Sequence, residues 1–189
     1  GILYNKNKTR LLKFPAQKVT NNFTISVSVE FINNWAFENC ILLNNVTISN
    51  NVKTIGVNSF INCTNLVAVT IGDKVEGISD YAFNRCSNLK EIYIPDLVNS
   101  IGTDIFWQCN SLETIEVSFA NSVYSSQDGI LYNKHKTNLI KCPLRKSGAV
   151  KVPDGVGKIE TNAFYDCKYL NCVTIPSTVS EIGYSSFYN

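Results

Sequence analysis

A period of 23 residues is the feature of this sequence that most constrains its fold. The clearest copy of the unit runs from Val75 to Leu97 and reads VEGISDYAFNRCSNLKEIYIPDL. Five apolar positions recur at this interval in four consecutive copies: Ile32, Ile55, Ile78 and Ile101; Phe37, Phe60, Phe83 and Phe106; Cys40, Cys63, Cys86 and Cys109; Leu43, Leu66, Leu89 and Leu112; Val46, Val69, Ile92 and Ile115. A fixed period of this length indicates one small unit repeated along an axis. Because one unit cannot bury its own apolar side, the copies must stack, and the sequence predicts a solenoid.

Each unit is predicted to contain two short strands and one turn. The segment from Leu89 to Ile94 has the pattern L-x-x-I-x-I of a strand with one face inward. Pro95 ends this strand because proline cannot donate a backbone hydrogen bond. Residues 75–78 predict a second extended segment, and residues 79–83 predict a 3₁₀ or α-helical turn. The predicted fold class is therefore a β-rich solenoid of short strands and 3₁₀ or helical turns.

A second internal repeat predicts two β-hairpins. Residues 1–15 read GILYNKNKTRLLKFP and residues 129–143 read GILYNKHKTNLIKCP, with polar, turn-prone residues between apolar segments. The predicted organisation is one solenoid, 1–189, with a hairpin or cap at 1–28, repeats at 29–117, a hairpin insert at 118–155 and truncated repeats at 156–189. Gly1 opens within the hairpin motif and Asn189 lies within a repeat, so we expect a piece of a longer protein.

Composition excludes several classes of protein. The net charge of +2 gives no general attraction to nucleic acid or to membranes, and the basic segments lack the aromatic platform that single-stranded nucleic acids need. No apolar segment approaches the roughly 18 residues of a membrane span, and no signal peptide is visible. Sequons at Asn7, Asn22, Asn45 and Asn62 are as frequent as chance predicts, so they are no evidence for secretion.

The seven cysteines are predicted to be mostly buried free thiols. Five of them share one repeat position among apolar neighbours: Cys40, Cys63, Cys86, Cys109 and Cys167. Stacked strands lie roughly 4.8 Å apart with parallel side chains, whereas a disulfide needs Cβ atoms about 3.8 Å apart that face each other. Zinc is the alternative, but no C-x-x-C pair or nearby histidine supports it. No cofactor or metal is expected.

The pattern V-x-x-I-x-x-x-A-F-x-x-C-x-x-L-x-x-V/I-x-I-P resembles the BspA-like, or treponemal-type, leucine-rich repeat family. The match covers residues 29–117 and 156–189, and the module at 128–137 resembles a hairpin insert of the same family. Ser59 and Ile105 depart from the pattern, where alanine is usual. The resemblance implies a right-handed solenoid in surface or secreted proteins of oral bacteria and mucosal protozoa, trichomonads among them. It also implies adhesion to host matrix, cells or other microbes, with no catalytic residues to carry over.

Catalysis has little support in the residues. The one histidine, His135, lies in the second hairpin turn, and Cys142 follows across that hairpin. A Cys–His nucleophile needs mutual reach and an orienting third group. The first hairpin has Asn7 and Phe14 at the corresponding positions, so neither residue belongs to a repeated mechanism. The chain is predicted not to be an enzyme.

Two surfaces are candidates for binding. The hairpin segment 129–151 is basic and contains no acid, so it predicts contacts with acidic glycans through Lys134, Lys136, Arg145 and Lys146. The alternative is that these residues only make exposed hairpins soluble. The outward positions of the L-x-x-I-x-I strands form the second surface, with Glu91, Tyr93 and Glu116 as candidate contacts, because tyrosine favours interface centres. The alternative is an ordinary strand surface, and a glycan on Asn45 would argue against binding there.

The predicted function is a non-enzymatic extracellular binding module of the adhesin type, at the cell surface or secreted. Its partner is expected to be a protein or an acidic glycan of a host surface or matrix. Self-association through the open solenoid ends is possible, because uncapped repeats leave apolar surface unpaired. The alternative is an intracellular protein–protein interaction scaffold, since reduced thiols fit a reducing compartment at least as well.

Overall fold

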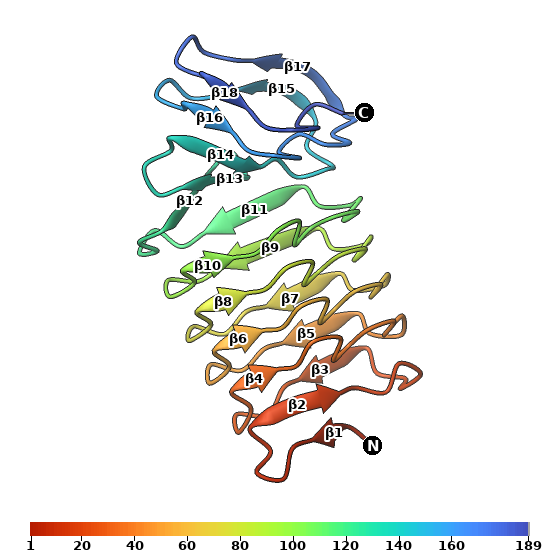
Figure 1. Ribbon diagram of the computed structural model, residues 1–189. Helices are drawn as coiled ribbons and strands as arrows, with labels where there is room; N and C mark the ends of the chain where they lie inside the picture. Colours follow the sequence, from red (N-terminus) through yellow and green to blue (C-terminus); the bar gives the residue numbers. More distant parts are fainter. Residues whose placement is uncertain (189) are drawn as a thin grey trace.

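The structure of the protein is a computed structural model that describes residues 1–188, and it is an elongated stack of short strands (Figure 1). One side carries a six-stranded sheet in the order β1 (Leu3–Tyr4), β2 (Arg10–Lys13), β4 (Phe31–Ile32), β6 (Thr54–Ile55), β8 (Gly77–Ile78) and β10 (Ser100–Ile101). The other side carries β3 (Asn22–Thr24), β5 (Asn45–Thr47) and β7 (Ala68–Thr70), followed by the pair β9 (Glu91–Ile94) and β11 (Thr114–Val117).

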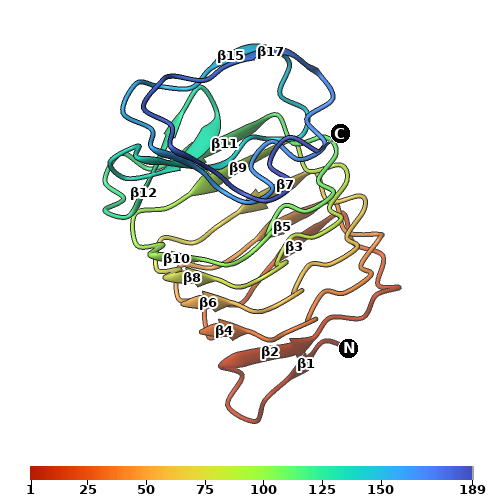
Figure 2. The same ribbon diagram turned by 45° about the horizontal axis from the view of Figure 1, so that its top comes forward.

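The C-terminal part repeats this two-sided plan. One sheet has the order β12 (Tyr124–Gln127), β13 (Ile130–Asn133), β14 (Asn138–Lys141), β16 (Lys158–Ile159) and β18 (Glu181–Ile182). The opposite pair is β15 (Gly148–Lys151) and β17 (Leu170–Thr174). Figure 2 shows the same two layers from another direction, with the later strands stacked beyond β11.

The repeats stack in the register that the 23-residue period predicts. Ile32 pairs with Ile55, and Ile55 pairs with Ile78, in parallel strands. On the opposite side, Val46 pairs with Val69. The predicted solenoid of 23-residue repeats is therefore confirmed.

The predicted helical turn takes the form of successive reverse turns. Ala82 N–H donates to Ser79 O at 3.2 Å, and Cys86 N–H donates to Phe83 O at 3.1 Å. Two positions in each repeat have a left-handed backbone: Trp35 and Asn39, Asn58 and Asn62, Tyr81 and Arg85, Asp104 and Gln108, Asn162 and Asp166. Left-handed residues cannot continue a right-handed helix. For this reason no residue within 1–188 is helical.

A column of phenylalanine rings fills the core. Successive rings of Phe37, Phe60, Phe83 and Phe106 are nearly parallel, with centroids 4.6, 5.3 and 6.1 Å apart. All four are buried. The framework phenylalanines are thus interior residues, as predicted, and each ring contacts the equivalent ring of the neighbouring repeat.

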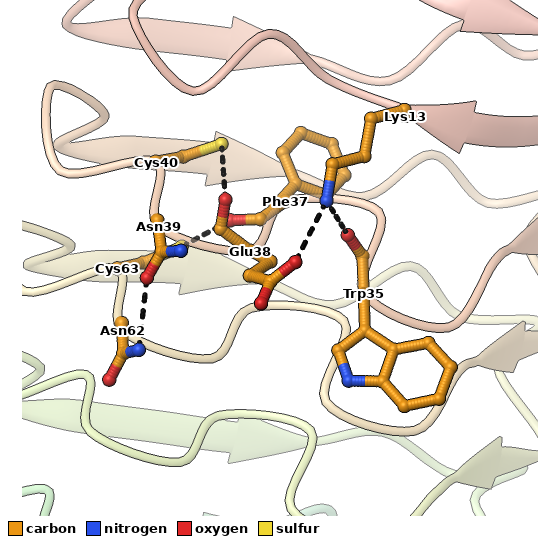
Figure 3. A network of polar contacts seen from close by, with 8 residues as sticks. All are labelled: Lys13, Trp35, Phe37, Glu38, Asn39, Cys40, Asn62 and Cys63. Atoms are coloured by element: carbon orange, nitrogen blue, oxygen red, sulfur yellow. Dashed lines mark hydrogen bonds and ion pairs between the residues drawn. The ribbon is translucent and has the colours of Figure 1, made fainter.

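The cysteine column lies beside the phenylalanines and consists of free thiols. Three of these thiols donate to the phenylalanine carbonyl of the preceding repeat: Cys63 Sγ to Phe37 O at 3.0 Å (Figure 3), Cys86 Sγ to Phe60 O at 3.2 Å and Cys109 Sγ to Phe83 O at 3.1 Å. Burial raises the pKa of the Cys109 thiol to about 12. Six of the seven cysteines are buried and Cys172 is exposed. The prediction of buried free thiols is confirmed for the shared repeat position.

Ser59 places an unsatisfied polar group in this core, and its replacement by alanine should stabilise the protein. The side chain is fully buried, its hydroxyl has no hydrogen-bond partner, and the equivalent residues Ala36 and Ala82 are apolar. We expect Ser59→Ala to raise the free energy of unfolding by about 1 kcal/mol, because the mutation removes an unsatisfied buried hydroxyl. Urea denaturation measures the change, with the exposed Ser177→Ala as a control that stays within about 0.5 kcal/mol. A loss of stability in Ser59→Ala would contradict this explanation.

Both predicted hairpins are present, and each also supplies a rung of the solenoid. Strands β1 and β2 are antiparallel, as are β13 and β14. The second strand of each hairpin then pairs in parallel with the next repeat, Leu11 with Ile32 and Leu139 with Ile159. A hairpin therefore replaces the start of a repeat and does not simply project from the stack.

Strand β13 divides the interior into two cores. Leu131 packs with the buried residues of the N-terminal repeats, whereas its neighbours Ile130 and Tyr132 pack with those of the C-terminal repeats. All three side chains are at most 2% exposed. Because successive strand residues point to opposite faces, one strand can serve both cores.

Candidate functional site

Two columns of outward side chains run along the sheet face of β5, β7, β9 and β11. The first column contains Asn45, Ala68, Glu91 and Thr114, and the second contains Thr47, Thr70, Tyr93 and Glu116. Asn45 pairs with Ala68 and Thr47 with Thr70; Glu91 pairs with Thr114 and Tyr93 with Glu116. The structure thus brings together the three residues predicted for this face, Glu91, Tyr93 and Glu116.

A hollow of about 360 Å³ lies on this face beside Tyr93. Its lining comes from three strands: Ala68, Val69, Thr70, Ile71, Glu91, Ile92, Tyr93, Thr114 and Glu116. Ala68 and Thr70 are short, so the Tyr93 ring stands above them and is 53% exposed. The arrangement offers one large amphipathic ring next to an apolar floor, with Glu116 opposite it on the neighbouring strand and Glu91 two positions earlier in its own strand.

Glu116 is fixed in place before any partner arrives. Its Oε1 accepts a hydrogen bond from Thr114 Oγ1 at 2.9 Å, and its Oε2 accepts one from Ser126 Oγ at 2.9 Å. Ser126 also accepts a hydrogen bond from Val117 N–H at 3.0 Å. Glu91 is exposed, and no ion pair is formed by it within residues 1–188. The face therefore presents one ordered and one free carboxylate, which suits donors or cations on a partner.

The sequon residue Asn45 lies on the same face. Its Nδ2 donates to Asn22 Oδ1 at 2.7 Å, and Asn22 begins another sequon. Both side chains are exposed. A glycan at either position would project from the end of the face opposite to Glu116.

The four basic residues predicted to bind glycans fall into two pairs. Arg145 and Lys146 line a hollow of about 420 Å³ together with Glu113, Ser147 and Tyr169. The Arg145 guanidinium lies 3.9 Å from the centre of the Tyr169 ring, and Lys146 Nζ donates to Asp128 O. This pair forms a basic hollow with an aromatic wall.

The other pair anchors the hairpin. Lys134 Nζ donates to Phe119 O and Asn121 O, and Lys136 Nζ donates to Gln127 Oε1 at 2.7 Å. No hydrogen bond within residues 1–188 links one pair to the other. The lysine contacts favour a structural role for Lys134 and Lys136.

Neither a nucleophile pair nor a metal cluster is visible in the described part of the chain. His135 is exposed in its turn, whereas Cys142 is fully buried in the second core and its thiol donates to Pro143 O. Within residues 1–188, no group of three or more histidine, cysteine or acidic residues could hold a metal ion. Nor does any helix in that range have the length and apolarity needed to cross a membrane.

Three residues of these surfaces were missed by the sequence analysis. Ser126 and Tyr169 lie outside the repeated pattern of the strand face, and Glu113 precedes β11. Ser126 reaches Glu116 only because β12 returns alongside β11. No signal in the sequence marks such a contact, whereas Tyr169 follows Lys146 by 23 residues, so the period places it beside the basic segment 129–151.

Comparisons with known proteins give a consistent family and fold. A profile described as BspA type Leucine rich repeat region matches six copies, over residues 14–138 and 141–189. A leucine-rich repeat protein from Eubacterium ventriosum is 26% identical with a TM-score of 0.73, over 95% of this chain and 56% of that one. The pneumococcal vaccine antigen PcpA is 22% identical with a TM-score of 0.75, over 95% and 51%.

A leucine rich cell surface protein from Faecalibacterium prausnitzii is 27% identical with a TM-score of 0.58, over 97% of this chain and 68% of that one. No curated protein matches this chain. The chain spans little more than half the length of the first two solved structures.

Proposed function

Because the chain belongs to the BspA-type leucine-rich repeat family, we propose that it is a non-enzymatic module that binds a protein on a host surface or matrix, outside the cell that makes it. The cell surface description of the similar Faecalibacterium prausnitzii protein supports this setting. The contact surface in this proposal is the sheet face around Tyr93. The observation that carries it is the hollow in which an exposed tyrosine lies beside both Glu91 and Glu116.

The energetics of interfaces favour this face. Tyrosine residues in well-packed pockets are among the few that carry most of the binding energy. The ordered Glu116 carboxylate loses little conformational freedom on binding, because Thr114 and Ser126 already hold it. An arginine or lysine of a partner would meet both carboxylates, which gives the face a preference for basic partner surfaces.

We expect Tyr93→Ala to weaken attachment to host cells or immobilised matrix proteins at least about tenfold. The measurement compares binding curves of wild type and variant on the same surface. Tyr184→Ala is the matched control, because Tyr184 is 85% exposed on the last repeat and far along the chain from the face. Equal loss in both variants, or unchanged binding in Tyr93→Ala, would contradict the proposal.

A second candidate function is the capture of acidic glycans in the basic hollow. The stacked Arg145 and Tyr169 side chains beside Lys146 favour it. The Arg145→Ala, Lys146→Ala double variant is expected to elute from heparin at lower salt than wild type. The matched control changes Lys134 and Lys136 to alanine, which removes the same charge from the hairpin turn. Equal shifts in both double variants would mean that heparin senses net charge and not this hollow.

A further inference from the structure

In each regular repeat, three backbone N–H groups donate hydrogen bonds to carbonyl oxygens of the repeat that follows it. In the middle of the turn, Phe37 N–H donates to Ser59 O at 2.7 Å, Phe60 N–H to Ala82 O at 2.8 Å, and Phe83 N–H to Ile105 O at 3.0 Å. The left-handed residues two positions before and after each phenylalanine donate in the same way, as Tyr81 does to Thr103 and Arg85 to Trp107. The amides at these positions therefore point along the axis toward the next repeat.

This ladder is interrupted once, after the repeat that contains Phe106. The equivalent amides of Asp104, Phe106 and Gln108 have no backbone or side-chain acceptor within residues 1–188. The ladder resumes beyond the hairpin, where Phe164 N–H donates to Ser186 O at 2.8 Å. The corresponding donors of the other framework repeats are all paired with the repeat that follows, so the three unpaired ones, at alternate positions 104, 106 and 108, mark a break in the stack.

A groove lies where the ladder is missing. It has a volume of about 290 Å³ and is lined by Ile101, Gly102, Thr103, Asp104, Ile105, Phe106, Leu131, Ile140, Lys141, Glu160, Thr161 and Asn162. The two long walls are equivalent segments of two repeats, 101–106 and 160–162, which the hairpin β13–β14 holds apart. One wall carries the free amides of Asp104 and Phe106. The other carries the carbonyl of Thr161, which accepts no hydrogen bond in the described chain, whereas its counterpart Thr103 accepts one from Tyr81.

Polar side chains hold the two walls at this separation. Lys141 is 9% exposed, and its Nζ donates to Asn162 O at 2.7 Å. Asn162 Nδ2 in turn donates to the two carboxylate oxygens of Asp104 at 3.1 and 3.3 Å. In the first hairpin, Lys13 makes the corresponding bond to Trp35 O at 2.8 Å (Figure 3). The lysine bond is therefore a property of the hairpin, and in the second hairpin it ties β14 to the wall that carries Asn162.

The charges of the groove nearly cancel. Lys141 and Asp104 have opposite charges, and the carboxylate of Glu160 is paired with Lys158 at 3.2 Å. Burial lowers the pKa of the Lys141 ammonium group. What the walls offer instead is an uncharged set of two amide donors and one carbonyl acceptor. This set is complementary to the main chain of an extended peptide.

We propose that the groove binds a short extended peptide segment by strand addition. The segment places its carbonyl oxygens on the amides of Asp104 and Phe106 and one of its N–H groups on the carbonyl of Thr161. It thereby supplies the hydrogen bonds that a following repeat supplies elsewhere in the stack. Main-chain bonds of this kind give affinity with little demand on side chains. The site is separate from the sheet face, so the result of its test does not depend on the proposed function.

The test is a titration of the ¹⁵N-labelled protein with the uncharged peptide N-acetyl-trialanine amide. We expect saturable shifts centred on the amides of Asp104 and Phe106, and at least about tenfold slower hydrogen exchange of these two amides in the complex. The exposed Thr161→Trp variant fills the groove and should bind at least tenfold more weakly. Val57→Trp at the equivalent position of an intact rung is the control and should bind like wild type.

Thr103→Trp blocks the same groove from the opposite wall, which keeps the test valid if Thr161→Trp does not fold. Sodium acetate distinguishes a carboxylate site from a peptide site. Equal shifts with acetate, shifts centred elsewhere, no saturable shift, or wild-type affinity in both groove-filling variants would overturn the proposal.

Discussion

Replacing Phe83 by alanine is expected to lower the free energy of unfolding by about 3–5 kcal/mol. The ring is fully buried and lies between Phe60 and Phe106, whose centroids are 5.3 and 6.1 Å away. Its removal leaves a cavity, since the rings on both sides belong to hydrogen-bonded repeats that cannot collapse far. Equilibrium urea denaturation, followed by tryptophan fluorescence and circular dichroism, measures the loss.

The control for this experiment is Phe119→Ala, because Phe119 is 97% exposed. It should change the stability by no more than about 0.5 kcal/mol. In a stack, each repeat is stabilised mainly by its neighbours. A cavity in a central repeat therefore also weakens the coupling between the repeats that precede it and those that follow it. A loss below about 1 kcal/mol in Phe83→Ala would show that the phenylalanine column does not hold the repeats together.

Asn121→Ala is expected to cost about 3–5 kcal/mol, although it removes only a small polar side chain. Asn121 is fully buried. Its Nδ2 donates to Pro95 O at 2.8 Å and to Val98 O at 2.9 Å, and its Oδ1 accepts from Val123 N–H at 2.9 Å and Tyr124 N–H at 2.7 Å. Alanine would remove a hydrogen bond from each of these four backbone groups, and within residues 1–188 only Pro95 O would keep another one, from Val98 N–H at 3.4 Å. Each buried unpaired group costs about 1–3 kcal/mol.

The position of Asn121 explains why this effect is specific. It follows Val98 by 23 residues, in the column of Val29, Val52, Val75 and Val98. An apolar residue there would continue the regular stack, whereas the asparagine amide turns the chain toward β12. Asn121→Val tests this directly, because it restores the repeat pattern but should be as destabilising as Asn121→Ala. The exposed Asn110→Ala is the control; a cost below about 1 kcal/mol for either variant at Asn121 would contradict the assigned role.

Periodicity was sufficient to predict the stack and its core. The isoleucine, phenylalanine and cysteine positions lie on adjacent rungs because a spacing of 23 residues is the length of one turn of the solenoid. The left-handed residues were not predicted. Trp35 and Tyr81 have no intrinsic preference for positive φ, so no local signal in the sequence marks these positions.

The hairpin was predicted as an insert, but its place inside the stack was not. The segment of Ile130, Leu131 and Tyr132 reads as an ordinary strand, and nothing local shows that both of its faces are buried. That burial depends on two cores which form from distant parts of the chain. The interruption of the hydrogen-bond ladder at Phe106 has the same cause, because the hairpin takes the place of the following repeat. It therefore could not be predicted from the sequence either.

The candidate site on the sheet face was predictable for a simple reason. Glu91, Tyr93 and Glu116 occupy alternate positions of two neighbouring strands, so alternation and period together place them side by side. The basic residues lie outside the period, and their partners Gln127 and Asp128 lie at the end of β12 and directly after it, in the non-repeated hairpin insert. Charge pattern alone could not separate the pair that lines a hollow from the pair that anchors the hairpin.

The central claim is that residues 23 positions apart lie on adjacent rungs of one stack. Nuclear Overhauser contacts between the phenylalanine rings, measured in specifically labelled protein, test it most directly. The structure predicts ring contacts from Phe37 to Phe60, from Phe60 to Phe83 and from Phe83 to Phe106, with none that skip a repeat. The absence of contacts between consecutive rings, or direct contacts between Phe37 and Phe83, would contradict it.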